Sequence, residues 1–170
     1  HEALDGAALA GGVATLEQDD DPGARLLGPR LQLQQLDLQP VMSLVSRIVH
    51  IKQVPAGTSV SYGCTHRTQQ QTWLATLPLG YADGYSRALS NKAEVLVHGL
   101  RRKVVGRVCM DQIVIDLGPD CDAVVGDDVV LFGRQGQAEI TLTELAVLAG
   151  TINYELSCAI SARVPRVYVE

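Results

Sequence analysis

From Val41 onward the chain is a succession of short segments rich in Val, Ile and Leu, separated by Gly, Asp or Asn residues that favour turns. Short apolar segments at close intervals are typical of β-sandwiches and β-barrels. A longer segment, residues 41–54, ends at a Pro-Ala-Gly turn and carries polar residues on both faces. We predict strands over residues 41–54, 73–79, 94–98, 104–108, 112–117 and 129–132, and a final strand over residues 163–169.

Helix is predicted only near the C-terminus. The sequence TLTE at 141–144 matches a capping box, in which the first Thr and the Glu satisfy backbone donors at a helix start. Three leucines recur at helical spacing until Gly150, and a further helical turn is predicted over 151–156. The predicted fold class is therefore mainly β: a β-barrel-like domain with a short helical insert near the C-terminus.

The first 36 residues differ from the rest of the chain. They lack strand alternation and contain an acidic run, residues 17–21, which we interpret as a solvated charged segment. We interpret residues 1–36 as a linker or the remnant of a preceding domain, and residues 37–170 as one domain. Because the chain begins with His1 rather than Met, we expect a fragment of a longer protein.

Composition excludes several classes of protein. The net charge is −5, and the longest basic run, Arg101-Arg102-Lys103, falls at a predicted hairpin tip where it forms a solvated turn. No apolar stretch approaches the roughly 18 to 20 residues of a membrane-spanning helix, and the N-terminus lacks a secretory pattern. We therefore predict a cytoplasmic protein with neither a nucleic-acid partner nor a membrane partner.

The four cysteines are widely spaced, with neither CxxC pairs nor the Cys/His spacing of a zinc site. We expect independent, buried thiols and no metal, because free Cys commonly behaves as a small hydrophobic residue. Walker, GxGxxG, HExxH and GxSxG motifs are also absent from the sequence. The chain therefore carries none of these self-contained active-site motifs.

Several polar or sulfur-containing residues lie in glycine-containing or abruptly turning segments: Tyr62, Tyr81, Asp83, Met110, Asp111 and Tyr154. Each has an ordinary interpretation when taken alone. A tyrosine at a strand end usually packs its ring and leaves its hydroxyl in water, and Ala-Asp-Gly is a common turn sequence. Only the combination of these segments is informative.

Four segments together resemble the alanine racemase family in content and order: VSYG at 60–63, LPLGYADGY at 77–85, VGRVCMDQ at 105–112 and TINYEL at 151–156. The likeness extends from LQPVMS at 38–43 to RVPR at 163–166, about the last three quarters of the chain. It implies a two-domain homodimeric enzyme, with an N-terminal (β/α)8 barrel that holds pyridoxal phosphate on a lysine and this β domain behind it. Each active site then lies between one subunit's barrel and the other's C-terminal domain.

The resemblance also implies roles for particular residues. Interconversion of L- and D-alanine, which provides D-alanine for peptidoglycan, needs two bases on opposite faces of the substrate, while the cofactor acts as an electron sink. One base would be the barrel lysine and the other Tyr62; because a phenol is a poor base at neutral pH, cationic neighbours would have to come from the partner barrel. The Met110 amide would meet the substrate carboxylate, Tyr81 would narrow the substrate entrance, and Tyr154 would bind the cofactor phosphate.

The chain's lysines are Lys52, Lys92 and Lys103, and none has the sequence context of the cofactor-anchoring lysine. We therefore expect the isolated chain to be inactive and to need an alanine racemase barrel domain and a small amino acid as partners. The segment DPGARLLG at 21–28 resembles the RPGxxLYG segment that closes the family's barrel, with departures at Asp21 and Leu27.

Two alternatives stay open at the level of sequence. One is a racemase of broader substrate range, or a related decarboxylase built from the same two domains. The other is a non-catalytic binding or dimerisation module. The GYADG and CMDQ segments favour a racemase, and the presence of Tyr62 within its full motif weighs against a non-catalytic module.

Overall fold

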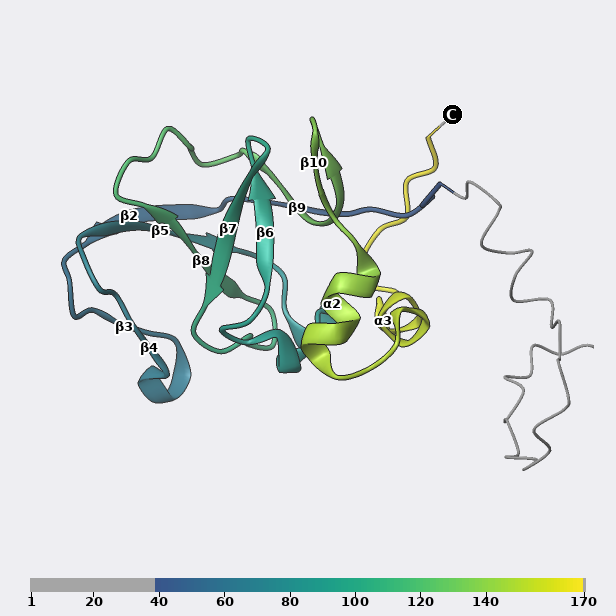
Figure 1. Ribbon diagram of the computed structural model, residues 1–170, viewed down its shortest axis with the longest axis horizontal. Helices are drawn as coiled ribbons and strands as arrows, with labels where there is room; N and C mark the ends of the chain where they lie inside the picture. The colour runs from purple at the N-terminus through teal and green to yellow at the C-terminus, as the bar shows by residue number, and fades with distance from the viewer. Residues whose placement is uncertain (1–38, 170) are drawn as a thin grey trace, which may run out of the picture. The chain divides into compact units, whose positions relative to one another are not determined.

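The computed structural model describes residues 39–169, which form a β-rich body with two short helices near its C-terminal end (Figure 1). The strands are β1 Leu44–Arg47, β2 His50–Val54, β3 Ser59–Val60, β4 His66–Arg67, β5 Thr72–Leu77, β6 Glu94–Val97, β7 Leu100–Val105, β8 Ile113–Gly118, β9 Asp128–Gln135 and β10 Ala138–Ile140. The 3₁₀ turns are η1 Tyr62–Cys64, η2 Tyr81–Asp83 and η3 Arg87–Leu89, and the α-helices are α2 Leu142–Ala149 and α3 Asn153–Ala159.

The main sheet is antiparallel and closes on itself. Its strand order is β1-β9-β6-β7-β8-β5-β2, with β10 paired to β9 as an additional hairpin. The two ends of this order, β1 and β2, are consecutive in the chain and are separated only by Ile48 and Val49. The Ile48 amide donates to the Asp127 carbonyl oxygen, and the Val49 amide donates to the Thr76 carbonyl oxygen. One bent strand therefore pairs with both edges of the sheet, which removes the free edges and makes a barrel.

This bend corrects the prediction of a single strand over residues 41–54. The chain changes partner at Ile48 and Val49, from β9 to β5. Leu44 and Ile48 face the main core before the bend, whereas after it Ile51 packs against that core and Val54 joins a second cluster, so the inward face changes. That change explains why polar residues fall on both faces of the segment. Ile48 is nevertheless 1% exposed and packs in the core at the bend.

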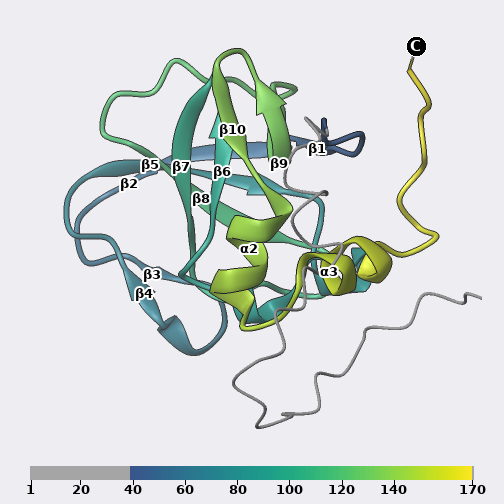
Figure 2. The same ribbon diagram turned by 45° about the vertical axis from the view of Figure 1, so that its right-hand side comes forward.

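The core fills the barrel as the strand patterns predict. Alternate residues of β8 are buried, from Ile113 to Leu117, and four consecutive residues of β9, Val129 to Phe132, are buried as well. A second, smaller cluster lies under the β3–β4 hairpin and consists of Val54, Val60, Leu74 and Val105. In both views this hairpin and the two α-helices lie at the lower end of the barrel, and the β9–β10 hairpin lies at the upper end (Figure 1, Figure 2).

Helix α2 is held to the barrel by charged side chains. Thr141 caps its start by accepting a hydrogen bond from the Glu144 amide, and Gly150 ends it with a φ of 75°. Arg101 on β7 reaches both oxygens of the Glu144 carboxylate, at 2.5 and 3.0 Å, and also the Glu94 carboxylate at 3.2 Å. The Arg101 guanidinium, by donating to Glu144, holds the pKa of that carboxyl below its usual range. The predicted hairpin is confirmed, with its turn at His98 and Gly99, but the solvated role of Arg101 is wrong, because this residue lies on β7 and pairs with two carboxylates.

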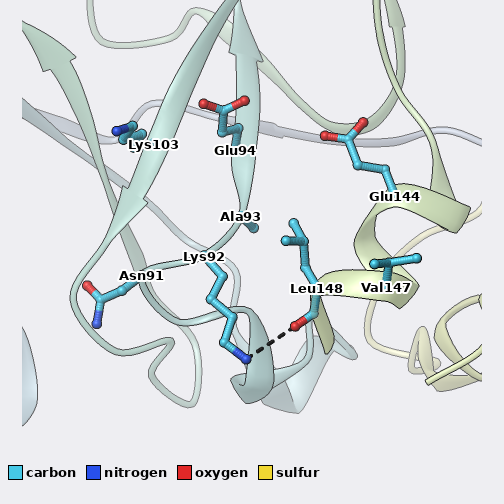
Figure 3. A pocket seen from close by; sticks show the side chains of 8 residues that line it. All are labelled: Asn91, Lys92, Ala93, Glu94, Lys103, Glu144, Val147 and Leu148. Atoms are coloured by element: carbon cyan, nitrogen blue, oxygen red, sulfur yellow. Dashed lines mark hydrogen bonds between the residues drawn. The ribbon is translucent and has the colours of Figure 1, made fainter. Parts of the chain in front are cut away.

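Beside this ion pair, Lys92 donates to the carbonyl oxygen of Leu148 at 3.2 Å (Figure 3). The hollow along this seam between β6, β7 and α2 is lined by both charged and apolar side chains, among them Lys103 and Val147. None of the predicted site residues lines it. We therefore assign this seam to the attachment of the helices rather than to a functional site.

Most predicted elements are confirmed with shifted bounds, and four features differ besides the bend at Ile48. Strand β7 begins at Leu100 rather than at residue 104. Its first half was not predicted as strand because it carries basic residues in place of the β-branched residues that indicate a strand. Strand β10 and the β3–β4 hairpin were not predicted, because both are very short. The predicted final strand at 163–169 is wrong: Pro165 lacks an amide donor, and Arg166 folds back onto the carbonyl oxygens of Ile160, Ser161 and Val164.

Helices of the described region are too short or too polar to cross a membrane. The predicted linker at residues 1–36 lies outside the described residues, as does the barrel-closing resemblance at 21–28.

The core contains one polar atom whose removal should stabilise the fold. Tyr85 is 2% exposed, its hydroxyl has no hydrogen-bond partner within the described residues, and burial raises the pKa of this phenol above its ordinary value. A buried hydroxyl without a partner costs roughly 1 to 3 kcal/mol. We therefore expect Tyr85→Phe to raise the free energy of unfolding in urea by about 1 kcal/mol. A loss of stability of that size would instead show that the hydroxyl has a partner.

Candidate functional site

At one end of the barrel, the turns after β3 and β5 and the connection between β7 and β8 surround a hollow of about 570 Å³, here named the rim pocket. It is lined by Tyr62, Tyr81, Arg87 and residues 107–112. Three of the four predicted site residues, Tyr62, Tyr81 and Met110, thus lie around one pocket although they are far apart in the sequence.

These three side chains are held at the surface rather than in the core. Tyr62 is 76% exposed, Met110 is 55% exposed and Tyr81 is 45% exposed. Large apolar or aromatic groups gathered at an exposed pocket are typical of a binding surface. The Tyr62 side chain is therefore free to contact a further molecule or domain.

A close backbone contact joins the Tyr81 turn to the Met110 segment. The Tyr81 amide donates to the Cys109 carbonyl oxygen at 2.9 Å, and the Ala82 amide donates to the Met110 carbonyl oxygen at 2.8 Å. Gly80 makes this approach possible, because a Cβ atom there would overlap the Cys109 oxygen and lie 2.5 Å from the Met110 oxygen. The spacing between Tyr81 and Met110 is consequently fixed by main-chain atoms.

Asp83 stabilises the same turn from within. Its side chain is almost buried, and its carboxylate accepts the Gly80 amide at 2.9 Å and lies 3.4 Å from the Arg163 guanidinium. The Asp83 carbonyl oxygen also accepts the Ser161 amide. The turn that carries Tyr81 is therefore tied to the C-terminal segment, which explains why the GYADG sequence needs its aspartate.

The pocket is suited to an anionic group. Arg87 and Arg107 line it together with one acidic residue, Asp111, so the charged lining residues leave an excess of positive charge. The Met110 amide donates no hydrogen bond within the described part of the chain. A backbone amide and two guanidinium groups are donors that a carboxylate can accept.

Tyr154, the fourth predicted site residue, does not line the rim pocket. It lies in the first turn of α3 and is 73% exposed. The helix borders an adjoining hollow of about 460 Å³, which is also lined by Tyr81, Gly150 and Glu155. The structure therefore places Tyr154 on an element next to the rim pocket, with Tyr81 between the two hollows.

None of the chain's three lysines lines the rim pocket. Within residues 39–169, no three His, Cys, Asp or Glu side chains gather in a way that could hold a metal ion. All four cysteines are free thiols, but the expectation that they are buried is wrong, since Cys64 and Cys158 are exposed and the other two are partly exposed. Two of these cysteines are in turns or helices at the surface rather than in the barrel core.

The sequence interpretation missed three residues at this site. Arg107 lies within a recognised segment and Arg87 lies two residues after another, yet neither received a role. Their positive charge was the available signal, but only the fold shows that both line one pocket. Ser61, directly before Tyr62, was also passed over, and its unusual backbone conformation cannot be seen in the sequence.

The fold and the rim pocket define a closed antiparallel β-barrel domain that exposes two tyrosines and a methionine at one end. Comparison with known families gives a match over residues 41–168 to the family described as alanine racemase, C-terminal domain. The chain belongs to this family.

Individual relatives agree with that assignment. The chain is 51% identical over 150 residues to an alanine racemase of Halothermothrix orenii, and 54% identical over 132 residues to one of Desulforamulus reducens. These matches cover 86% and 78% of this chain but only 40% and 35% of the two relatives. The chain thus spans about two fifths or less of the length of these relatives.

Solved structures give the same result for the fold. Alanine racemase of Bacillus anthracis with bound L-Ala-P matches with a TM-score of 0.77 and 46% identity, over 85% of this chain and 37% of that protein. The alanine racemase of D-cycloserine-producing Streptomyces lavendulae matches with a TM-score of 0.77 and 44% identity, over 84% of this chain and 37% of that protein. The predicted β-barrel-like fold and the family resemblance are both confirmed.

The contact at Gly80 provides a test of how the site is assembled. We expect Gly80→Ala to lower the free energy of unfolding by about 2 kcal/mol, because the added methyl group overpacks against backbone. We also expect faster hydrogen exchange at the Tyr81 and Ala82 amides. The control is Gly136→Ala, where nothing lies within 4 Å of an added Cβ atom; the φ of 63° there costs some stability, but the protection of the Tyr81 and Ala82 amides should not change. Unchanged protection of both amides in the Gly80 variant would refute the close contact.

Proposed function

We propose that this chain is the C-terminal domain of a pyridoxal-phosphate-dependent alanine racemase. In this proposal Tyr62 is delivered as a proton carrier into an active site completed by a barrel domain of a partner chain. The enzyme interconverts L- and D-alanine and provides D-alanine for peptidoglycan. A cytoplasmic location, homodimeric assembly and inactivity of the isolated domain belong to the same proposal.

The observation that carries the proposal is the common placement of Tyr62, Tyr81 and Met110. All three line the rim pocket, and all three are substantially exposed. A side chain that serves a site in a second domain has to project from its own domain, as Tyr62 does. Family membership adds support, because the chain spans only 35–40% of the length of the two relatives described above.

In this proposal Tyr62, Met110 and Tyr81 have separate tasks. Tyr62 would hold or accept the Cα proton at its phenolic oxygen on one face of the substrate. The Met110 amide would donate to the substrate carboxylate, and the excess positive charge of the lining arginines would favour the same group. Tyr81 would limit the width of the approach, since it stands between the two adjoining hollows.

The described residues fit a supporting role toward the cofactor and not an anchoring one. Tyr154 exposes its side chain on α3, where its hydroxyl would donate to the phosphate group. No lysine lines the rim pocket, so the anchoring amine would belong to the partner barrel. When bound, pyridoxal phosphate stabilises the negative charge that develops at Cα.

We expect Tyr62→Phe, made in the full-length enzyme, to lower kcat by at least about a hundredfold, because loss of a general acid–base group typically costs 10² to 10⁴ in rate. The primary isotope effect with Cα-deuterated alanine should rise for one enantiomer only, since a single face loses its proton carrier. Steady-state kinetics with both deuterated enantiomers measures both quantities.

The matched control is Tyr168→Phe, which removes the same hydroxyl from a tyrosine that is 93% exposed and lines neither hollow. This control should retain normal turnover. Normal turnover of the Tyr62 variant as well would reject the proposal and favour a non-catalytic dimerisation module.

A further inference from the structure

We infer that Ser61 is the positioning residue that holds Tyr62 in register with Met110, by stabilising a strained backbone turn through its hydroxyl. This inference rests on the proposed role of Tyr62 as the proton carrier. It assigns Ser61 no contact with the substrate.

The side chain of Tyr62 cannot position itself by packing. It is 76% exposed, and its phenol makes no hydrogen bond within the described residues. The direction of the ring therefore depends on the backbone of the turn η1 and on the residue that precedes it. That residue is Ser61, the N-cap of η1.

The backbone of this turn is strained on both sides of Tyr62. Ser61 has a φ of 61° with a ψ of −178°, a region that is essentially restricted to glycine. On the other side, Gly63 has a φ of 73° and Cys64 a φ of 48°. Such conformations persist only where the surroundings enforce them, and they concentrate at functional sites.

Three contacts enforce the conformation of Ser61. Its hydroxyl donates to the Arg107 carbonyl oxygen at 2.8 Å and lies 3.5 Å from the Cys109 sulfur. The preceding residue, Val60, is 4% exposed and anchored in the small core cluster under the hairpin. At Gly106 a Cβ atom would lie 2.6 Å from the Ser61 Cβ atom, so only glycine allows the two segments to come this close.

These contacts join the two groups that must act together. Arg107, which accepts the Ser61 hydroxyl, begins the segment that leads to Met110. The same segment is joined to the Tyr81 turn through Cys109 and Met110. Ser61 thus connects the proton carrier to the amide proposed to hold the substrate carboxylate, and the distance between them is set by main-chain geometry.

The test compares two substitutions in the full-length enzyme. Ser61→Ala removes the hydrogen bond and leaves a Cβ atom in the strained conformation, so the turn should relax and displace Tyr62. We expect kcat to fall about tenfold to a hundredfold, as for a misplacement of about 1 Å, with KM for alanine changed less than about threefold. The isotope effect should rise for the same enantiomer as in Tyr62→Phe.

Ser61→Gly also loses the hydroxyl, but glycine adopts the required φ and ψ without strain. It should recover most of the activity lost in Ser61→Ala. The matched control is Ser59→Ala, an exposed serine two residues earlier on β3 that makes no side-chain hydrogen bond within the described residues, and its kinetics should be unchanged. Cofactor absorbance and circular dichroism of each variant report whether it is folded and loaded.

The outcomes separate this inference from the proposed function. Normal kinetics of Ser61→Ala beside an impaired Tyr62→Phe would overturn the positioning role alone. Equal impairment of Ser61→Ala and Ser61→Gly would also overturn it. The hydroxyl would then not act by stabilising the strained backbone conformation. Normal kinetics of Tyr62→Phe would overturn both.

Discussion

The rim pocket depends on the close approach of three backbone segments, which two glycines allow. Gly80 lets the Tyr81 turn contact the Cys109–Met110 main chain, and Gly106 lets the Ser61 turn contact the end of β7. Hydrogen bonds from main-chain amides and one serine hydroxyl complete both contacts. Because main-chain positions vary less than exposed side chains, this arrangement gives a rigid base to groups that are themselves exposed.

The barrel explains why such groups can be exposed at all. Closure of the sheet through the bent strand β1–β2 encloses the core, and the rim loops are anchored in it by buried residues such as Leu79, Tyr85 and Val108. Loops on a rigid scaffold are where binding and catalytic residues concentrate. The pocket is open on the described domain, and we propose that a partner barrel covers it and supplies the cofactor, its lysine and the exclusion of water.

The sequence predicted the fold class, most strands, the Thr141 cap and the Gly150 stop, because these depend on local patterns. It also identified Tyr62, Tyr81, Met110 and Tyr154 through the family resemblance, and their roles stay proposals. Sequence patterns could not show that Ile48 marks a change of strand partner, since that depends on barrel closure. They also could not show the strained backbone of Ser61, or that Arg87 and Arg107 line the same pocket, because both result from the packing of distant segments.

The most direct test of the central claim uses two inactive full-length chains, one carrying Tyr62→Phe and the other lacking the cofactor lysine of its barrel. The two are mixed in equal amounts under conditions that exchange subunits, and racemisation is measured. If Tyr62 serves the partner's barrel, each mixed dimer contains one intact site, and activity should return to about one quarter of the wild-type value, from statistical mixing of a two-fold dimer. No return of activity, with exchange of subunits verified by mass, would contradict the account.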